Sequence, residues 1–94
     1  MRLSEAEVRE RLKGLPGWTY TGGRIEKRYP FRAFTDGLAF VNRVAAIAEA
    51  LDHHPDVLLQ YGSVTLMCTT HSEKGVTEKD FELAARCELA LAEE

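Results

Sequence analysis

The stretch Phe34–Pro55, FTDGLAFVNRVAAIAEALDHHP, decides the fold of this chain. Its apolar residues recur at helical spacing, and they predict one long helix that runs from about Phe34 to Asp52. Proline disfavours helical geometry in the residue before it, so Pro55 should end the helix, with His53 near the last turn and His54 extended. Two adjacent imidazoles at such a junction are partly exposed and titrate near neutral pH.

The apolar residues of the long helix form two rows. The first row is Phe34, Leu38, Val41, Ala45 and Ala48, and the second is Phe40, Val44, Ile47 and Leu51. Two interpretations stay open: one wide stripe that faces the core, or a helix that is buried both in the core and against a partner. At its start the helix shows no strong cap, and Thr35 is the best candidate.

A β-hairpin is expected on each side of the long helix. The predicted strands and turns are 18–21 and 24–31, joined by Gly22-Gly23, and 57–61 and 64–70, joined by Gly62-Ser63. Gly62 in the first loop position would suit a type II′ turn. Pro30 indicates that its strand either lies at an edge of the sheet or ends there.

Two further helices flank these elements. Ser4-Glu5-Ala6-Glu7 is a capping box that predicts a helix start, and Pro16-Gly17 predicts the end of that helix. Thr77 should cap a last helix that has Asp80 in its third position and runs to about Ala92.

The predicted order of elements is therefore α-β-β-α-β-β-α. Hairpins give antiparallel strand pairs, and three amphipathic helices need one apolar sheet face to cover. We expect an α+β fold in which a four-stranded antiparallel sheet carries three helices on one face. A chain of 94 residues makes a single domain, here spanning residues 1–94.

Composition and charge exclude several classes of protein. The net charge is −3 and no stretch concentrates Lys and Arg, which argues against nucleic-acid binding. No window approaches the ~18 apolar residues of a membrane span, and the first residues lack a signal-peptide pattern, so we expect a cytoplasmic protein. Cys68 and Cys87 lie in separate elements and should be reduced and buried.

Two residues join the histidine pair as candidates for chemistry. His71 follows the last predicted strand and Asp80 begins the last helix, and neither placement is required for packing. Each also has a structural interpretation, His71 as an ordinary loop residue and Asp80 as a helix cap. A zinc site is a weaker alternative, because adjacent histidines rarely reach one ion and no zinc-type ligand spacing is present. Cys–His catalysis is disfavoured as well, since Cys68 lies on the inward row of a strand.

Several segments together carry a resemblance to a known family. The matching segments are 15–18 (LPGW), 29–34 (YPFRAF), 49–55 (EALDHHP), Tyr61, Thr70-His71 and Asp80. In this order, and over nearly the whole chain, they resemble pterin-4a-carbinolamine dehydratase, also called 4a-hydroxytetrahydrobiopterin dehydratase. The chain departs from the family pattern at Val57, where the family often has tryptophan, and at Ala33, where the family commonly has an acidic residue.

The resemblance implies a hydro-lyase that removes water from a 4a-hydroxytetrahydropterin and yields a quinonoid dihydropterin, in the recycling of a pterin cofactor. Histidine suits the acid and base steps, and each such group contributes about 10²–10⁴-fold, so neither a metal nor a cofactor is implied. The catalytic residues would be His53, His54 and His71. His53 would be the acid for the leaving hydroxyl, His71 would act from the opposite wall, and His54 would orient the ring or take the N5 proton, although these roles stay interchangeable.

The resemblance also implies residues that contact or position the pterin substrate. Asp80 would hold the tautomer of His71 or accept a hydrogen bond from the pterin. Asp52 and Thr70 would contact the polar edge of the pterin, and Pro55 would shape the turn.

A second class of function stays open. Members of the resembled family can also act without catalysis, by binding a dimeric transcription factor through the long helix. The two apolar rows would support such a partner, or a homodimer or homotetramer formed through the same helix. A pure binding module needs no titrating histidines, so the three histidines favour the enzyme.

Overall fold

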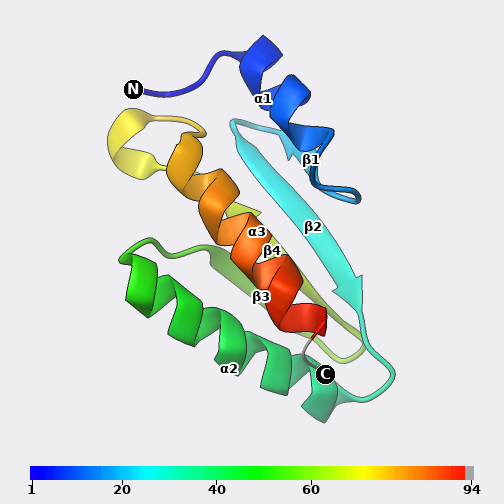
Figure 1. The fold of residues 1–94 in the computed structure, drawn as a ribbon. Coiled ribbons are helices and arrows are strands. Elements are labelled where there is room, and N and C mark those ends of the chain that lie inside the picture. The colour runs from blue at the N-terminus through cyan, green and yellow to red at the C-terminus, as the bar shows by residue number, and fades with distance from the viewer. Residues whose placement is uncertain (93–94) are drawn as a thin grey trace.

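The computed structural model describes residues 1–92, and Figure 1 shows how its helices and strands are arranged. The elements are α1 (Glu5–Leu12), β1 (Thr19–Thr21), β2 (Arg24–Pro30), α2 (Phe34–Leu51), β3 (Asp56–Gln60), β4 (Ser63–Cys68), the short 3-10 turn η1 (His71–Glu73) and α3 (Glu78–Ala92). The predicted order α-β-β-α-β-β-α is confirmed.

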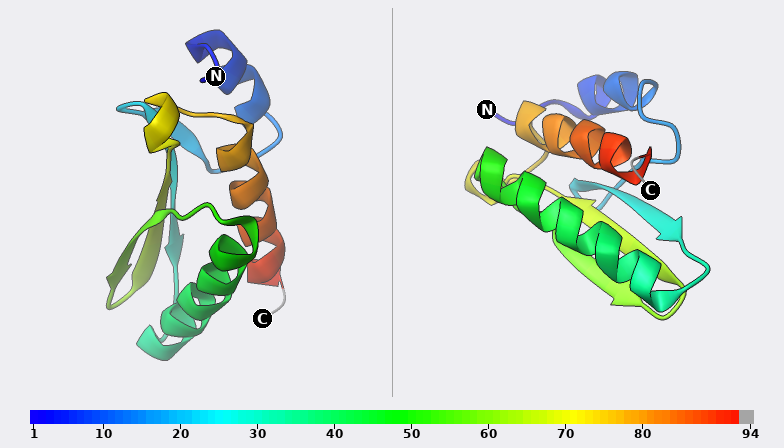
Figure 2. Two further views of the ribbon diagram at one scale, coloured as in Figure 1. Left: turned by 90° about the vertical axis from the view of Figure 1, so that its left-hand side faces the viewer. Right: turned by 60° about the horizontal axis from the view of Figure 1, so that its bottom comes forward.

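The four strands form one antiparallel sheet in the order β1-β2-β4-β3. The helices α2 and α3 pack side by side, and the three helices cover one face of the sheet, as predicted (Figure 2). Pro30 is the last residue of β2, and β2 is a central strand of the sheet. Of the two positions predicted for Pro30, the end of a strand is confirmed and the edge of the sheet is wrong.

The core lies between the sheet and the helices. Its buried side chains include Val8, Ile25, Tyr29, Phe40, Val44, Ala48, Val64, Leu66, Cys68, Leu83, Ala84 and Cys87. Both cysteines are free thiols, and burial raises the pKa of each, that of Cys87 to about 12. They are core residues, as predicted, and they are unreactive because the thiolate is the nucleophilic form.

The predicted capping box of α1 and the predicted Thr77–Asp80 cap of α3 are both present. Ser4 Oγ accepts a hydrogen bond from the Glu7 N–H at 3.1 Å, and Glu7 Oε1 accepts one from the Ser4 N–H at 2.8 Å. At α3, Thr77 Oγ1 accepts from the Lys79 N–H at 3.2 Å, and Asp80 Oδ2 accepts from the Thr77 N–H at 2.9 Å. These bonds satisfy backbone donors that a helix start leaves without an intrahelical partner.

The start of α2 differs from the prediction. Ala33 occupies the N-cap position in an extended conformation, and no side chain caps the helix there. Thr35 lies inside the first turn of α2, so its assignment as the cap is wrong. A residue within the helix cannot adopt the extended backbone of an N-cap.

The end of α2 is set by Asp52 rather than by Pro55. Asp52 adopts the left-handed conformation, with φ 51° and ψ 43°. The Asp52 N–H donates to Glu49 O at 3.3 Å and the His53 N–H donates to Ala48 O at 3.1 Å, which is the pattern of a Schellman motif. His53 lies two residues after the end of α2 and donates to a carbonyl of the last turn, so its predicted place near that turn is confirmed, whereas the prediction that Pro55 ends the helix is corrected.

The two hairpin turns give one confirmation and one correction. The Gly22-Gly23 turn joins β1 to β2 with φ values of 57° and 79°, as a type I′ turn requires. The second turn is Tyr61-Gly62, because Ser63 already pairs with Gln60 in the ladder. Gly62 does not adopt a left-handed backbone, so the predicted type II′ turn at Gly62-Ser63 is wrong.

The apolar rows of α2 are divided between the core and the surface. Phe40, Val44 and Ala48 are buried, whereas Phe34 and Leu38 remain 42% and 40% exposed. One wide stripe that faces the core therefore does not describe this helix. Contact of the exposed residues with a partner stays a proposal.

A cluster of hydrogen-bonded polar side chains connects β2 to α3. Glu88 Oε2 accepts hydrogen bonds from Trp18 Nε1 at 3.1 Å, from Lys27 Nζ at 2.9 Å and from the hydroxyl of Tyr29. Burial alone would raise the pKa of Glu88, but the three hydrogen bonds together outweigh it and hold this pKa below its ordinary value.

Candidate active site

His53 and Asp80 meet where the chain leaves α2 and where α3 begins. His53 Nε2 lies 2.6 Å from Asp80 Oδ1, and the two side chains are 13% and 0% exposed. A carboxylate only accepts hydrogen bonds, so Nε2 donates and Nδ1 is left to face another group. Asp80 thereby fixes both the orientation and the tautomer of His53.

The second oxygen of Asp80 is held by residues behind it. Oδ2 accepts from the Thr70 hydroxyl at 2.8 Å and from the Thr77 N–H at 2.9 Å, and the two threonine hydroxyl oxygens lie 2.7 Å apart. The buried carboxylate is thus satisfied and held in one orientation. Asp80 holds His53, so its predicted pairing with His71 is wrong.

His71 is exposed and begins the 3-10 turn that follows β4. Thr70 and Gly75 close this turn with two backbone hydrogen bonds of 2.9 and 3.3 Å. Because Thr70 precedes His71 in the chain and its hydroxyl binds Asp80, the turn and the His53–Asp80 pair belong to one contiguous region.

His54 lies at the outer side of this region. Its Nε2 lies 2.5 Å from Glu49 Oε2, and the two side chains are 54% and 76% exposed. An exposed pair of this kind contributes little to stability, so the ring can exchange this contact for a ligand. The two residues are five apart across the helix end, so the helical pairing rules do not predict the contact.

The predicted substrate-binding residues have different surroundings. Asp52 is exposed, Pro55 is half-buried and Thr70 is buried. The Thr70 hydroxyl bonds to Asp80 within the protein, so the structure gives Thr70 a supporting position behind His53. Asp52 carries the reversal of the chain that leads into His53.

A hollow of about 390 Å³ lies beside His71, and we call it the His71 hollow. Its lining includes Arg24, Asp56, Thr69, His71 and Lys74. Asp56 begins β3 opposite Met67 of β4, and it was absent from the predicted site. No local motif marks Asp56, because its position beside His71 depends on the pairing of two strands.

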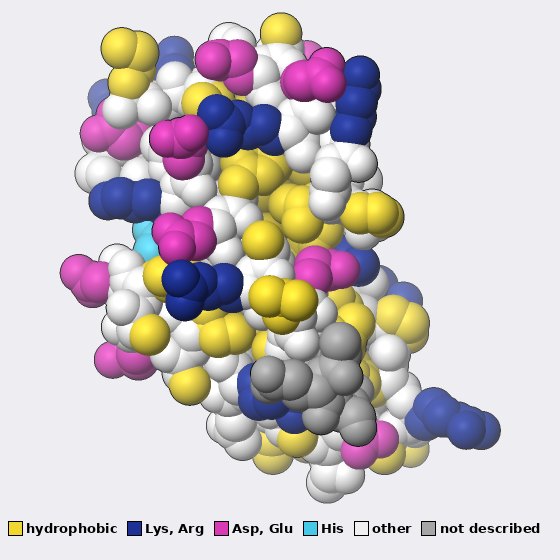
Figure 3. All heavy atoms as spheres, in the orientation of Figure 1, with side chains coloured by type: hydrophobic (Ala, Val, Ile, Leu, Met, Phe, Trp, Pro, Cys, Tyr) yellow, Lys and Arg dark blue, Asp and Glu magenta, His cyan; other side chains and the backbone are white. Residues whose placement is uncertain are grey.

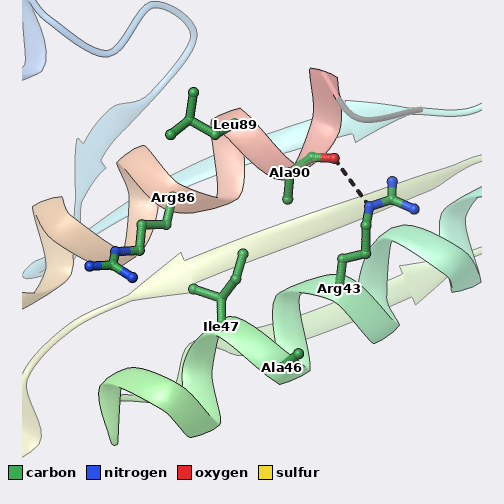
Figure 4. Close-up of a pocket in the computed structure, with 6 residues that line it drawn as sticks. All are labelled: Arg43, Ala46, Ile47, Arg86, Leu89 and Ala90. Carbon is green, nitrogen blue, oxygen red and sulfur yellow. Dashed lines mark hydrogen bonds between the residues drawn. The ribbon is translucent and has the colours of Figure 1, made fainter.

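A second hollow, of about 600 Å³, lies between α2 and α3. Figure 4 shows Arg43 of α2 and Arg86 of α3 at its sides, with Ile47 and Leu89 between them. A guanidinium group stays protonated near neutral pH and cannot act as an acid–base catalyst. The described residues that line this hollow include no histidine and no carboxylate.

Three further observations concern metal binding, membrane-spanning helices and surface charge. Within residues 1–92, no group of three or more His, Cys, Asp or Glu side chains is arranged to hold a metal ion. None of the helices in the described part of the chain has the length and apolar character of a membrane span. Acidic and basic side chains are interspersed on the face drawn in Figure 3.

Known proteins match this chain over nearly its whole length. Residues 1–90 match the family described as pterin 4 alpha carbinolamine dehydratase. The chain is 44% identical over 86 residues to a protein of Sulfolobus acidocaldarius, covering 92% of this chain and 94% of that one. It is 48% identical over 85 residues to a protein of Roseiflexus sp., covering 90% and 91%. Both relatives carry the provisional name of a pterin-4-alpha-carbinolamine dehydratase.

The fold also has a solved counterpart. The crystal structure of a transcriptional coactivator/pterin dehydratase from Brucella melitensis matches with a TM-score of 0.92 at 35% identity, covering 97% of this chain and 99% of that chain. In sequence and in fold, this chain belongs to the pterin 4 alpha carbinolamine dehydratase family.

Proposed function

We propose that this protein is a hydro-lyase that dehydrates a 4a-hydroxytetrahydropterin to a quinonoid dihydropterin and water, in the recycling of a pterin cofactor. The observation that carries the proposal is the 2.6 Å contact between His53 and the buried carboxylate of Asp80, next to the turn that presents His71. An imidazole oriented by a carboxylate is typical of acid–base catalysis. Membership of the family supports the same reaction.

The reaction requires one acid and one base. The C4a–O bond breaks with its electron pair on oxygen, and the oxygen takes a proton from the acid and leaves as water. The proton on N5 passes to the base, and the electron pair of the N–H bond forms the double bond between N5 and C4a. One proton is supplied and one is removed, so the proposed elimination is balanced without a metal or a cofactor.

We assign His53 as the general acid. When its ring holds two protons, Nε2–H donates to Asp80 and Nδ1–H is directed to the leaving hydroxyl. The carboxylate of Asp80 then faces the positive charge of the ring. His71 acts from the 3-10 turn on the other face of the pterin, and His54 orients the pterin or takes the N5 proton.

The remaining predicted site residues bind or support the substrate in this proposal. Asp52 is exposed next to His53, and its carboxylate contacts the polar edge of the pterin. Thr70 supports Asp80 through its hydroxyl and thereby positions His53. Pro55 shapes the segment between His54 and β3.

The test is the rate of 4a-hydroxytetrahydropterin dehydration by the purified protein and by His53→Ala, His54→Ala and His71→Ala. We expect wild-type acceleration, and a loss on the order of 10²-fold or more in His53→Ala and His71→Ala. Circular dichroism checks that each variant is folded. If all three variants keep the wild-type rate, the histidines do not form the catalytic site, and if the folded wild type gives no acceleration, the dehydratase proposal fails.

A non-catalytic partner-binding function is the second candidate. Phe34 and Leu38 on α2 remain exposed, and the related Brucella melitensis protein is described as a transcriptional coactivator as well as a pterin dehydratase. The simpler use of this surface is self-association, and we propose a cytoplasmic homodimer or homotetramer formed through α2, each protomer a single domain of residues 1–94. Light scattering with and without candidate partners separates self-association from partner binding.

A further inference from the structure

The His71 hollow opens on the face of the sheet that the helices leave uncovered. Arg24 and Thr69 line it, and their strand neighbours Ile25 and Cys68 point into the core. Side chains alternate between the two faces of a strand, so Arg24 and Thr69 point away from the helices. His71 lines this space, and the residue before it, Thr70, bonds to Asp80 and so connects its turn to the His53–Asp80 pair.

The chemistry of a pterin indicates what this space would receive. The reaction takes place at C4a and N5, and N5 is bonded to C6, the atom that carries the side chain of a natural pterin. A histidine that acts at C4a or N5 must therefore lie beside the start of that side chain. If His71 is catalytic, as proposed above, the side chain on C6 has the His71 hollow beside it.

Two cations line the His71 hollow against one carboxylate. Within residues 1–92, the ammonium group of Lys74 makes no ion pair. Arg24 forms an ion pair with Glu26, with 3.3 Å between Arg24 Nε and Glu26 Oε1. The carboxylate is that of Asp56, which can accept hydrogen bonds from hydroxyl groups of a pterin side chain. Arg24 is thus balanced by Glu26, whereas the ammonium of Lys74 has no carboxylate partner among the described residues, so an anionic group that reaches Lys74 gains an ion pair there.

Lys74 is held in place by the backbone around it. Its φ is 58°, its N–H donates to His71 O at 3.1 Å, and its carbonyl oxygen accepts from Arg2 Nη1 at 3.2 Å. On the other side of the hollow, Thr69 Oγ1 donates to Gly23 O at 3.0 Å and fixes the β1–β2 turn. The two walls that carry Lys74 and Arg24 are therefore positioned before any ligand binds.

We propose that the His71 hollow binds the C6 side chain of the pterin and selects side chains that end in an anionic group, a phosphate monoester or a carboxylate. This inference rests on the proposed dehydratase function. It assigns Arg24 and Lys74 to substrate specificity.

The test compares three 4a-hydroxytetrahydropterins that differ only in the end of the C6 side chain: neutral hydroxyl, carboxylate and phosphate monoester. The readout is the ratio of kcat/KM for each anionic substrate to that for the neutral one. We expect a ratio of roughly 5 to 10 for the wild type at low salt, since each partly exposed ion pair contributes up to about fivefold. The ratio should fall as salt is added, because exposed charges are screened.

The decisive variant is Arg24→Gln/Lys74→Asn, in which Asn tolerates the left-handed backbone of position 74. Its ratio should fall to about one. The matched control is Arg28→Gln/Lys13→Gln, which removes the same charge from exposed residues outside the hollow and should keep the wild-type ratio. A ratio above one for either anion, lost only in the first variant, supports the inference and identifies the anion. A wild-type ratio near one for both anions, or equal ratios in the two variants, overturns it.

An equilibrium measurement keeps the inference separate from the proposed activity. The stable 7,8-dihydropterins with neutral and phosphorylated side chains are titrated into the same three proteins, and the ratio of their Kd values is compared. If no substrate is dehydrated, the proposed function fails, while a Kd ratio that depends on Arg24 and Lys74 still supports the hollow as an anion-selective pterin site. A Kd ratio of about one in all three proteins overturns the inference whatever the activity.

Discussion

Asp80 is the residue on which two properties of the molecule depend. Its Oδ2 completes the capping box of α3, and its Oδ1 orients His53. An amide at this position keeps one acceptor oxygen but presents an NH₂ group in place of the other. Even this smallest change of side chain therefore disturbs a hydrogen bond of Asp80.

Asp80→Asn should slow dehydration on the order of 10²-fold, because an NH₂ group facing His53 would favour the wrong tautomer. The free energy of unfolding should fall by about 1–3 kcal/mol, since one buried hydrogen-bond pairing is disturbed. The control is Ser4→Ala, which removes the equivalent cap of α1 at a cost of about 1 kcal/mol and should leave the rate unchanged. Rate assays and urea unfolding on both variants check this, and a wild-type rate in folded Asp80→Asn would exclude the orienting role.

The lowered pKa of Glu88 predicts that the free energy of unfolding depends on pH. Burial alone would raise the pKa of Glu88, but the hydrogen bonds from Tyr29, Lys27 and Trp18 lower it in the folded state. A group whose pKa is lower in the folded state stabilises above its unfolded pKa, about 4.3 for glutamate, and this stabilisation is lost as the pH falls through the folded pKa.

Glu88→Gln should therefore be less stable than the wild type by about 1–3 kcal/mol near neutral pH. The difference should shrink as the pH is lowered below about 4.3. Urea unfolding at a series of pH values measures it. The same substitution at the exposed Glu10 should cost less than about 1 kcal/mol at every pH, because its ion pair with Lys13 is solvated. A pH-independent difference for Glu88→Gln would contradict the electrostatic explanation.

At the scale of elements, the left-handed residue at the end of α2 positions the segment that carries the candidate site. Asp52 has φ 51°, a conformation in which glycine is unstrained and a β-branched residue is strained. Its reversal of the chain brings His53 back toward Asp80 at the start of α3. The backbone of Asp52 and its carboxylate can be tested separately.

Asp52→Gly should keep the reversal and change the free energy of unfolding by no more than about 1 kcal/mol. Asp52→Val should destabilise by about 1–2 kcal/mol and slow dehydration, because the strained backbone would shift His53. The KM of Asp52→Gly then reports on the carboxylate alone. A raised KM supports contact of Asp52 with the pterin, and an unchanged KM removes Asp52 from the substrate-binding residues.

At the scale of the whole molecule, the exposed residues of α2 bear on its assembly. Leu38 is 40% exposed on α2, and Leu89 is 69% exposed on α3. If the protein associates through α2, Leu38→Glu should shift it to monomers in light scattering, while Leu89→Glu should not, since a charge in an apolar interface is costly to bury. Equal masses for Leu38→Glu and the wild type would argue against an interface at this position.

Local patterns predicted most of the fold, because their information lies within a few residues. The Ser4–Glu7 and Thr77–Asp80 spacings identified two helix starts, and Gly22-Gly23 identified a hairpin turn. The failures have a physical cause as well. The sequence favours Thr35 as the cap because the true N-cap, Ala33, has no capping side chain, and Asp52 adopts a backbone conformation that is more common for glycine.

The sequence suggested residues for the candidate site, but it did not predict the contacts between them. The sequence named His53, His71 and Asp80 as candidates, but which of them contact each other depends on tertiary structure. His53 and Asp80 are 27 residues apart, and no spacing rule reaches that far. Asp56 was missed for the same reason, since it reaches the His71 hollow only through the pairing of β3 with β4.

The double use of Asp80 has a consequence for how this protein can change over generations. In many enzymes, heat resistance and turnover are improved at the expense of each other, because activity needs flexibility or a strained active site. If Asp80 acts as proposed, a mutation at position 80 would lower both stability and turnover, so neither selection for a more stable protein nor selection for a faster one would retain it. A laboratory library screened only for survival of heating would therefore retain the aspartate, without any assay for the reaction.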